Sequence, residues 1–141
     1  MVLIKWRDSY SVNIEQIDKQ HERIVKLINE MFDVVRDKET NISLSYQIDK
    51  LIEYTQEHFN YEENLLEKAG YEFLDQHKKV HKGLVQEVMD LKELIEKNTD
   101  GMNSDFYSFL RSWLMDHILK EDMQYKDCMS TAKEKGLLSE E

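Results

Sequence analysis

The chain contains no proline and only one cysteine among its 141 residues. Proline interrupts helices and is common in loops, so its absence favours long helices joined by short connections. The single cysteine, Cys128, excludes a disulfide framework and a cluster of thiolate metal ligands within one chain. We expect this side chain to be a lone, partly buried thiol.

Two further absences bear on the location and partners of the protein. The sequence has no apolar run long enough to span a membrane, and the apolar stretch after Met1 is too short for a secretory signal. We therefore expect a cytoplasmic protein with no membrane partner. The net charge of −10 argues against nucleic acid and anionic lipid as partners, because both repel an acidic surface.

The spacing of apolar residues predicts four amphipathic helices at about residues 17–36, 43–68, 72–97 and 104–125. An arm at residues 1–16 precedes them, where Trp6, Tyr10, Val12 and Ile14 could pack against the helices, and a C-terminal tail follows. Gly70 suits the position just after a helix, and residues 98–101 predict a break.

Short connections favour antiparallel neighbours. We predict an all-α single domain (residues 1–141), an up-down-up-down antiparallel four-helix bundle, and a monomer, since no helix has an obvious second apolar stripe.

Histidines and carboxylates interrupt the apolar stripes of all four predicted helices. They occur in the patterns H-x-x-x-E, H-x-x-x-H and H-x-x-x-x-D, with one further histidine near the start of the first helix. Residues four apart lie on one face of a helix, and antiparallel helices bring the start of one beside the end of the next. All of these residues should therefore gather at one end of the bundle. The set comprises His21, His58, Glu62, His77, His81, His117 and Asp122.

A single histidine on an apolar stripe is more often a core or surface residue than a ligand, but the joint pattern favours a metal site. So many buried polar groups at one depth would stay unsatisfied without a cation. Five imidazole nitrogens and four carboxylate oxygens exceed the needs of one ion and would crowd two four-coordinate zinc ions. Two six-coordinate redox ions that share a solvent bridge would keep one open position for a small ligand such as dioxygen.

The residues around these positions resemble the hemerythrin family, especially its bacterial single-domain members. The matching stretches are D-K-Q-H at 18–21, H-F-N-Y-E-E at 58–63, G-Y at 70–71 and W-L-M-D-H-I at 113–118, together with Trp6, the His77 and His81 pair, Asp122 and Tyr125. The resemblance implies a four-helix bundle with two iron ions per chain and no haem. It implies that His77, His81 and His117 bind one iron and that His21 and His58 bind the other. Glu62 and Asp122 would bridge the irons, with an oxo or hydroxo group as the third bridge.

The resemblance also implies a pocket for dioxygen. Phe59, Trp113, Leu114 and Ile118 match positions whose apolar side chains line that pocket in the family, although ordinary core packing would explain them equally well.

Two features close to the expected ligands need a structural explanation. Asp122 follows His117 by five residues, which is about 140° around an ideal helix, so the two would not share a face unless the helix is distorted there. Asp18 and Gln20 flank His21 and could orient an imidazole, but they could equally be ordinary first-turn polar residues.

Two functions are compatible with such a site. The first is reversible binding of dioxygen for storage, delivery or sensing, without catalysis. The alternative is a di-iron oxidase or peroxidase, or a protein that handles nitric oxide. Oxygen-activating bundle enzymes use four glutamates, two histidines and two E-x-x-H motifs. This chain has no E-x-x-H motif and offers mostly neutral imidazoles, which favours the first function.

Overall fold

The computed structural model describes residues 4–36, 41–97 and 104–138, and every regular element within them is helical. Three long helices, α1 (Glu15–Arg36), α2 (Asn41–Ala69) and α3 (Leu74–Lys97), are followed by a composite fourth helix. This fourth helix consists of α4 (Ser104–Ser112), the π-helix η2 (Trp113–Leu119) and α5 (Lys120–Met123). A 3-10 turn, η1 (Asp8–Tyr10), lies in the N-terminal arm, and α6 (Lys126–Glu134) ends the described chain.

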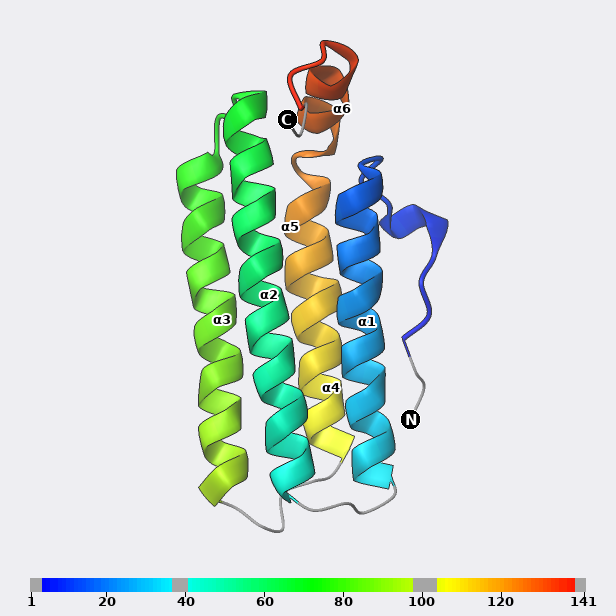
Figure 1. Cartoon of the computed structure of the whole chain (residues 1–141), viewed down its shortest axis with the longest axis vertical. Coiled ribbons are helices and arrows are strands. Elements are labelled where there is room, and N and C mark those ends of the chain that lie inside the picture. Colours follow the sequence, from blue (N-terminus) through cyan, green and yellow to red (C-terminus); the bar gives the residue numbers. More distant parts are fainter. Residues whose placement is uncertain (1–3, 37–40, 98–103, 139–141) are drawn as a thin grey trace.

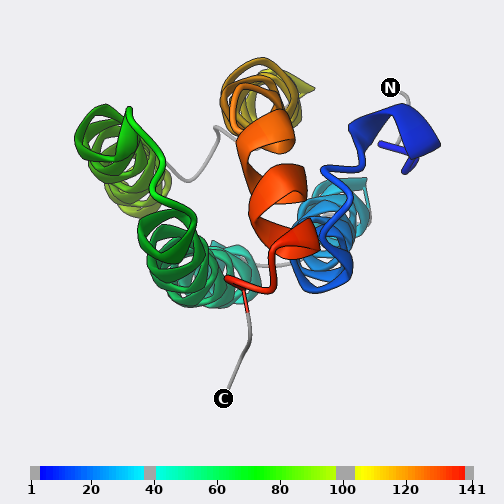
Figure 2. The ribbon, with the colours of Figure 1, turned by 90° about the horizontal axis from the view of Figure 1, so that it is seen from above.

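The helices form the predicted up-down-up-down antiparallel bundle. Successive long helices run in opposite directions, with α2 packed against both α1 and α3 and with α4 against α1 (Figure 1). Seen from above, α6 lies across the upper end of the bundle and the N-terminal arm runs outside α1 (Figure 2). Among the helices that the structure describes, none combines the length and apolarity that a membrane crossing requires.

The observed helix bounds differ from the expected ones mainly at the C-terminal end. The region expected as a tail contains α6, because Met129 and Ala132 are buried on one side of it. Gly136, with a φ of 73°, ends this helix, and the N–H of Leu137 donates to the carbonyl of Ala132 at 2.9 Å. The break expected at residues 98–101 lies outside the described residues.

Gly70 ends α2 as predicted. Its φ of 70° is a left-handed conformation that residues with a side chain rarely adopt. The N–H of Gly70 donates to the carbonyl of Glu67 at 3.1 Å, and the N–H of Tyr71 donates to the carbonyl of Leu66 at 3.0 Å. These bonds satisfy carbonyls at the helix end and turn the chain into α3.

Two apolar clusters lie on either side of the polar layer that holds the expected ligands. The larger cluster follows the bundle and includes Ile24, Leu84 and Leu119. The smaller one closes the upper end and comprises Val12, Ile14, Ile17, Leu65, Leu66, Tyr125 and Met129. Along α1, for example, His21 falls between Ile17 of the smaller cluster and Ile24 of the larger one. The polar layer is thus enclosed by apolar side chains on two sides.

The arm packs against the bundle as expected. Trp6 and Tyr10 contact the larger cluster, and Val12 and Ile14 are buried in the smaller one. The side chain of Asp18 ties the arm to α1 by accepting hydrogen bonds from the N–H of Val12 at 2.9 Å and the hydroxyl of Ser11 at 2.5 Å. Cys128 is a free, partly exposed thiol, as predicted.

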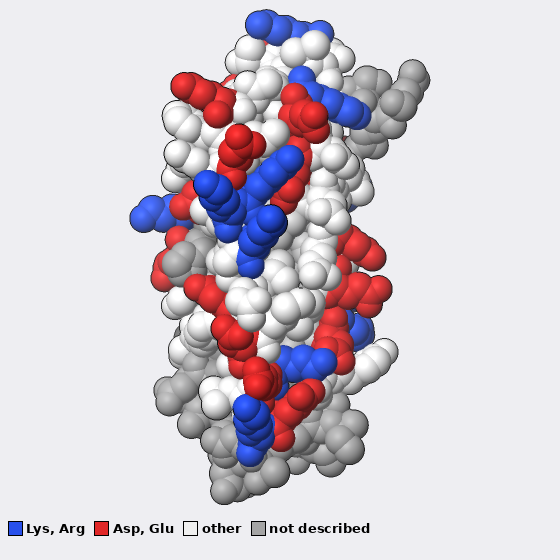
Figure 3. Space-filling model, turned by 90° about the vertical axis from the view of Figure 1, so that its left-hand side faces the viewer, with Lys and Arg blue, Asp and Glu red and all other residues white. Residues whose placement is uncertain are grey.

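The surface carries charges of both signs in spite of the net charge of −10. On the face drawn in Figure 3, acidic side chains follow the length of the molecule, and basic side chains gather in a patch in the upper half.

Candidate metal centre

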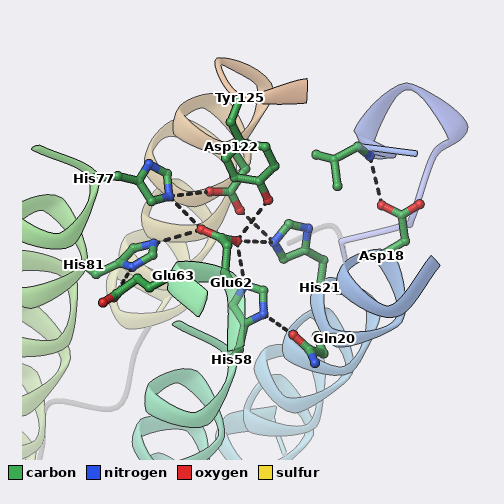
Figure 4. Close-up of polar contacts among 11 residues, drawn as sticks. Asp18, Gln20, His21, His58, Glu62, Glu63, His77, His81, Asp122 and Tyr125 are labelled. Carbon is green, nitrogen blue, oxygen red and sulfur yellow. Dashed lines mark hydrogen bonds and ion pairs between the residues drawn. The ribbon is translucent and has the colours of Figure 1, made fainter. Parts of the chain in front are cut away.

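Six of the seven expected ligands converge in the polar layer. His21 comes from α1, His58 and Glu62 from α2, His77 and His81 from α3, and Asp122 from α5 (Figure 4). Each of them is at most 4% exposed. The seventh residue, His117, belongs to η2, but its side chain lies outside the part that the structure describes.

The six side chains form two groups that share both carboxylates. In each group, one ligand atom from every member lies within 4.8 Å of the others. The first group is His21, His58, Glu62 and Asp122, and the second is Glu62, His77, His81 and Asp122. A carboxylate has two oxygens and can bind one cation with each, so shared carboxylates suit a pair of neighbouring cations.

Short distances connect these atoms, yet most of them form no hydrogen bond. Nε2 of His21 lies 2.8 Å from Oδ2 of Asp122, and Nε2 of His81 lies 3.0 Å from Oε1 of Glu62. Nε2 of His58 lies 3.3 Å from Oε2 of Glu62. The buried atoms left without a hydrogen-bond partner include both nitrogens of His21, Nε2 of His58, Nε2 of His81 and both oxygens of Asp122.

Such unpartnered buried polar atoms are costly, at about 1–3 kcal/mol each. Cations shared among the converging nitrogen and oxygen atoms would satisfy most of them, and neutral imidazoles with ionised carboxylates are good donors for first-row transition metals. The residues present therefore fit a pair of metal ions.

The electrostatics of the layer indicate an ionised carboxylate. Burial tends to raise the pKa of Glu62, but its close contacts with the imidazoles of His58, His77 and His81 outweigh burial and hold this pKa well below its usual value. Burial lowers the pKa of His58, which keeps its imidazole neutral and able to bind a metal.

The two other imidazoles in contact with carboxylates behave differently. Burial opposes charge on His77, yet contacts with Asp122 and Glu62 raise its pKa to about 10. The pKa of His21 is also raised, because its contact with Asp122 outweighs burial. Protons on these imidazoles balance the carboxylates in the metal-free protein, so metal binding would release them.

Three side chains around this layer hold the expected ligands in place. Oε1 of Gln20 lies 2.6 Å from Nδ1 of His58, and Oε2 of Glu63 lies 2.7 Å from Nδ1 of His81. When Nδ1 carries the proton and donates it to these oxygens, Nε2 points its lone pair into the layer. The hydroxyl of Tyr125 donates to Oε2 of Glu62 at 3.0 Å.

This outer set could be predicted only in part from the sequence. Gln20 does orient an imidazole, but that imidazole is the one of His58 on the neighbouring helix. Asp18 instead holds the arm against α1. Glu63 is a further partner that the expected set does not include, and its place directly after Glu62 in an H-x-x-x-E-E run is the signal that the sequence offers for it.

The distortion expected between His117 and Asp122 is present. Trp113–Leu119 form a π-helix, in which backbone hydrogen bonds join residues five apart. This wider turn reduces the angular offset of residues at a five-residue spacing. It accompanies the entry of Asp122, which is 1% exposed, into the polar layer.

The four apolar residues assigned to the dioxygen pocket are all buried. The ring of Phe59 stacks on the ring of His81, with centroids 3.7 Å apart and an interplanar angle of 2°. Trp113, Leu114 and Ile118 belong to the larger cluster, and the indole N–H of Trp113 donates to the carbonyl of Leu84 at 2.9 Å. Their role as a pocket for gas stays a prediction.

A groove on the outer side of the second group reaches one expected ligand. Its volume is about 580 Å³, and it lies between α2 and α3. Its lining includes Phe59, Glu63, Lys78, His81 and Lys82. Glu63, whose side chain is 20% exposed, thus connects the buried His81 to the solvent side of the bundle.

Comparison with known proteins agrees with this geometry. Residues 12–128 match the family described as the hemerythrin HHE cation binding domain. A bacteriohemerythrin of Pseudomonas aeruginosa is 34% identical over 129 residues, which cover 92% of this chain and 83% of the relative. A bacteriohemerythrin of Methylococcus capsulatus is 32% identical over 131 residues, which cover 92% and 99%. The solved structure of a wild-type hemerythrin superposes with a TM-score of 0.80 at 32% identity, again covering 92% and 99%. The chain therefore belongs to the hemerythrin family.

Proposed function

We propose that the chain binds two iron ions, one in each ligand group, and uses them to bind dioxygen reversibly for storage, delivery or sensing. The observation that carries the proposal is the pair of overlapping groups that share Glu62 and Asp122. The names of the relatives, bacteriohemerythrin and myohemerythrin, support it.

The two groups differ in the number of imidazoles that they offer. We assign His21 and His58 to one iron, and His77 and His81 to the other, with His117 as the additional ligand of the second iron. The first group therefore leaves more room for an exchangeable ligand. When bound, the irons would supply the electrons that dioxygen takes up on binding and returns on release.

The protein's own residues favour reversibility over catalysis. The site has two carboxylates, and its imidazoles are neutral once they bind metal, so it compensates less positive charge than a site with four carboxylates would. Further loss of electrons from the irons is then harder. The apolar clusters on both sides limit the entry of water, and we assign Phe59, Trp113, Leu114 and Ile118 to the space that dioxygen occupies.

The test combines metal analysis with gas cycling. The purified chain is loaded with ferrous iron without oxygen, its metal content is measured, and its visible spectrum is followed over repeated changes between air and argon. We expect two irons per chain, which correspond to the two ligand groups, and an absorption band that returns under air in each cycle. His77→Ala should lower the iron content.

Two results would contradict the proposal. One metal per chain, or zinc as the native ion, would rule out the iron pair. Complete conversion to an oxidised form in the first cycle, with turnover of an added reductant, would favour an oxidase or a peroxidase.

A further inference from the structure

We propose that Glu63 and Gln20 make the two metal positions chemically unequal, with Glu63 acting as a positioning residue that strengthens iron binding in the second group. This inference rests on the iron pair of the proposed function. It adds that the protein stabilises ferric iron more strongly at the position of the second group than at that of the first.

The two residues occupy equivalent places on opposite sides of the layer. Oε1 of Gln20, on α1, lies 2.6 Å from Nδ1 of His58 on α2. Oε2 of Glu63, on α2, lies 2.7 Å from Nδ1 of His81 on α3. In both cases Nε2 of the imidazole faces Glu62, at 3.3 Å and 3.0 Å. Each imidazole is therefore fixed between an outer oxygen and the shared carboxylate (Figure 4).

The outer oxygens differ in charge. The amide of Gln20 is neutral and can only orient its histidine, whereas an ionised carboxylate at Glu63 forms a stronger, charge-assisted hydrogen bond. A carboxylate partner makes the imidazole a more basic ligand. His81 should therefore donate more strongly than His58, and it should favour the higher charge of ferric iron at its own position.

The carboxylate of Glu63 borders the groove between α2 and α3. Glu63 is partly open to solvent there, and the cationic side chains of Lys78 and Lys82 line the same groove. The asymmetry between the amide of Gln20 and the carboxylate of Glu63 is a property of the side chains themselves and does not depend on the metal.

Two substitutions test the inference in opposite directions. Glu63→Gln gives His81 the same neutral partner that Gln20 gives His58, and Gln20→Glu gives His58 the charged one. Glu67→Gln serves as the matched control, because it removes one negative charge from an exposed position on α2, one turn away. The readouts are iron affinity, by chelator competition in the ferrous and ferric states, and the midpoint potential of the iron pair.

We expect Glu63→Gln to lower ferric affinity about 10-fold or more, with a smaller loss in the ferrous state and a more positive midpoint potential. Gln20→Glu should move the potential in the negative direction, and Glu67→Gln should leave both readouts unchanged. Melting of the metal-free variants separates these effects from a general loss of stability.

The outcomes distinguish this inference from the proposed function. If the parent protein holds two irons but Glu63→Gln behaves like Glu67→Gln, the inference alone is wrong. If Glu63→Gln does not fold, an unchanged potential in Gln20→Glu would still overturn it. If the parent protein binds no iron pair, both the inference and the proposed function fail.

Discussion

Replacing Tyr125 with phenylalanine would remove one hydroxyl group from the centre of the site and leave the aromatic ring in place. That hydroxyl donates a hydrogen bond of 3.0 Å to Oε2 of Glu62, and both residues are completely buried. The ring is held by the rings of His77 and Tyr71, whose centroids lie 5.6 Å and 6.2 Å away. Any change in stability therefore reports on the hydrogen bond and not on a large cavity.

The expected loss follows from the charge of the acceptor. A hydrogen bond to a charged group contributes about 1.5–3 kcal/mol to the free energy of unfolding. No solvent can replace the lost donor at a buried carboxylate, so the upper half of this range applies. For a chain of this size the melting temperature should fall by roughly 7–10 °C.

The assay is thermal unfolding of the metal-free protein, followed by far-ultraviolet circular dichroism. Tyr71→Phe is the matched control, because it removes the same hydroxyl group from a partly exposed ring that packs against Tyr125. It should change stability by less than about 0.5 kcal/mol. If Tyr125→Phe melts within the error of Tyr71→Phe, the hydroxyl does not support Glu62 and the reasoning is refuted.

Three further predictions concern the metal-free protein, the apolar pocket and the arm. Contacts with Asp122 and Glu62 outweigh burial and raise the pKa of His77 from 6.5 to about 10, so the stability that its charge contributes is complete below pH 6.5 and is lost as the pH rises towards 10. Denaturant unfolding of the metal-free protein at a series of pH values should show this decline in the free energy of unfolding. His77→Gln should make that free energy less dependent on pH. Leu114→Ala should cost about 2–5 kcal/mol and keep the iron but speed oxidation of the oxygen-loaded protein; an autoxidation rate equal to the parent's would make Leu114 an ordinary core residue. Asn13 has a φ of 64°, so Asn13→Ala should lower the free energy of unfolding by about 1 kcal/mol while Asn13→Gly should not; equal melting temperatures for the two variants would contradict this.

The bundle could be predicted from the sequence because one physical signal repeats throughout each long helix. A spacing of three and four residues between apolar side chains defines one buried face, and short connections then require antiparallel neighbours. The short helix α6 lacks such a repeat. Met129 belongs to the smaller apolar cluster, whose other members come mainly from α2 and the arm, so the burial of α6 depends on segments far away in the sequence.

The convergence of the expected ligands was also predictable, because helix length and direction fix the depth of each residue in an antiparallel bundle. The outer hydrogen bonds were not. Gln20 adjoins His21 in the sequence, but successive helical residues point about 100° apart, so its side chain reaches His58 on the next helix. Spacing gives the angle of a side chain on its own helix, and only the packed bundle shows which neighbour lies at that angle.

The five-residue step from His117 to Asp122 shows how a departure from ideal spacing can itself be informative. In a regular α-helix this step would separate the two side chains by about 140°. Both residues can lie on one side only if the helix is distorted, and π-type turns are frequent at functional sites. The π-helix at Trp113–Leu119 lies just before the point where Asp122 enters the polar layer. The irregular spacing in the sequence and the irregular turn in the structure thus occur together, directly before the carboxylate that belongs to both ligand groups.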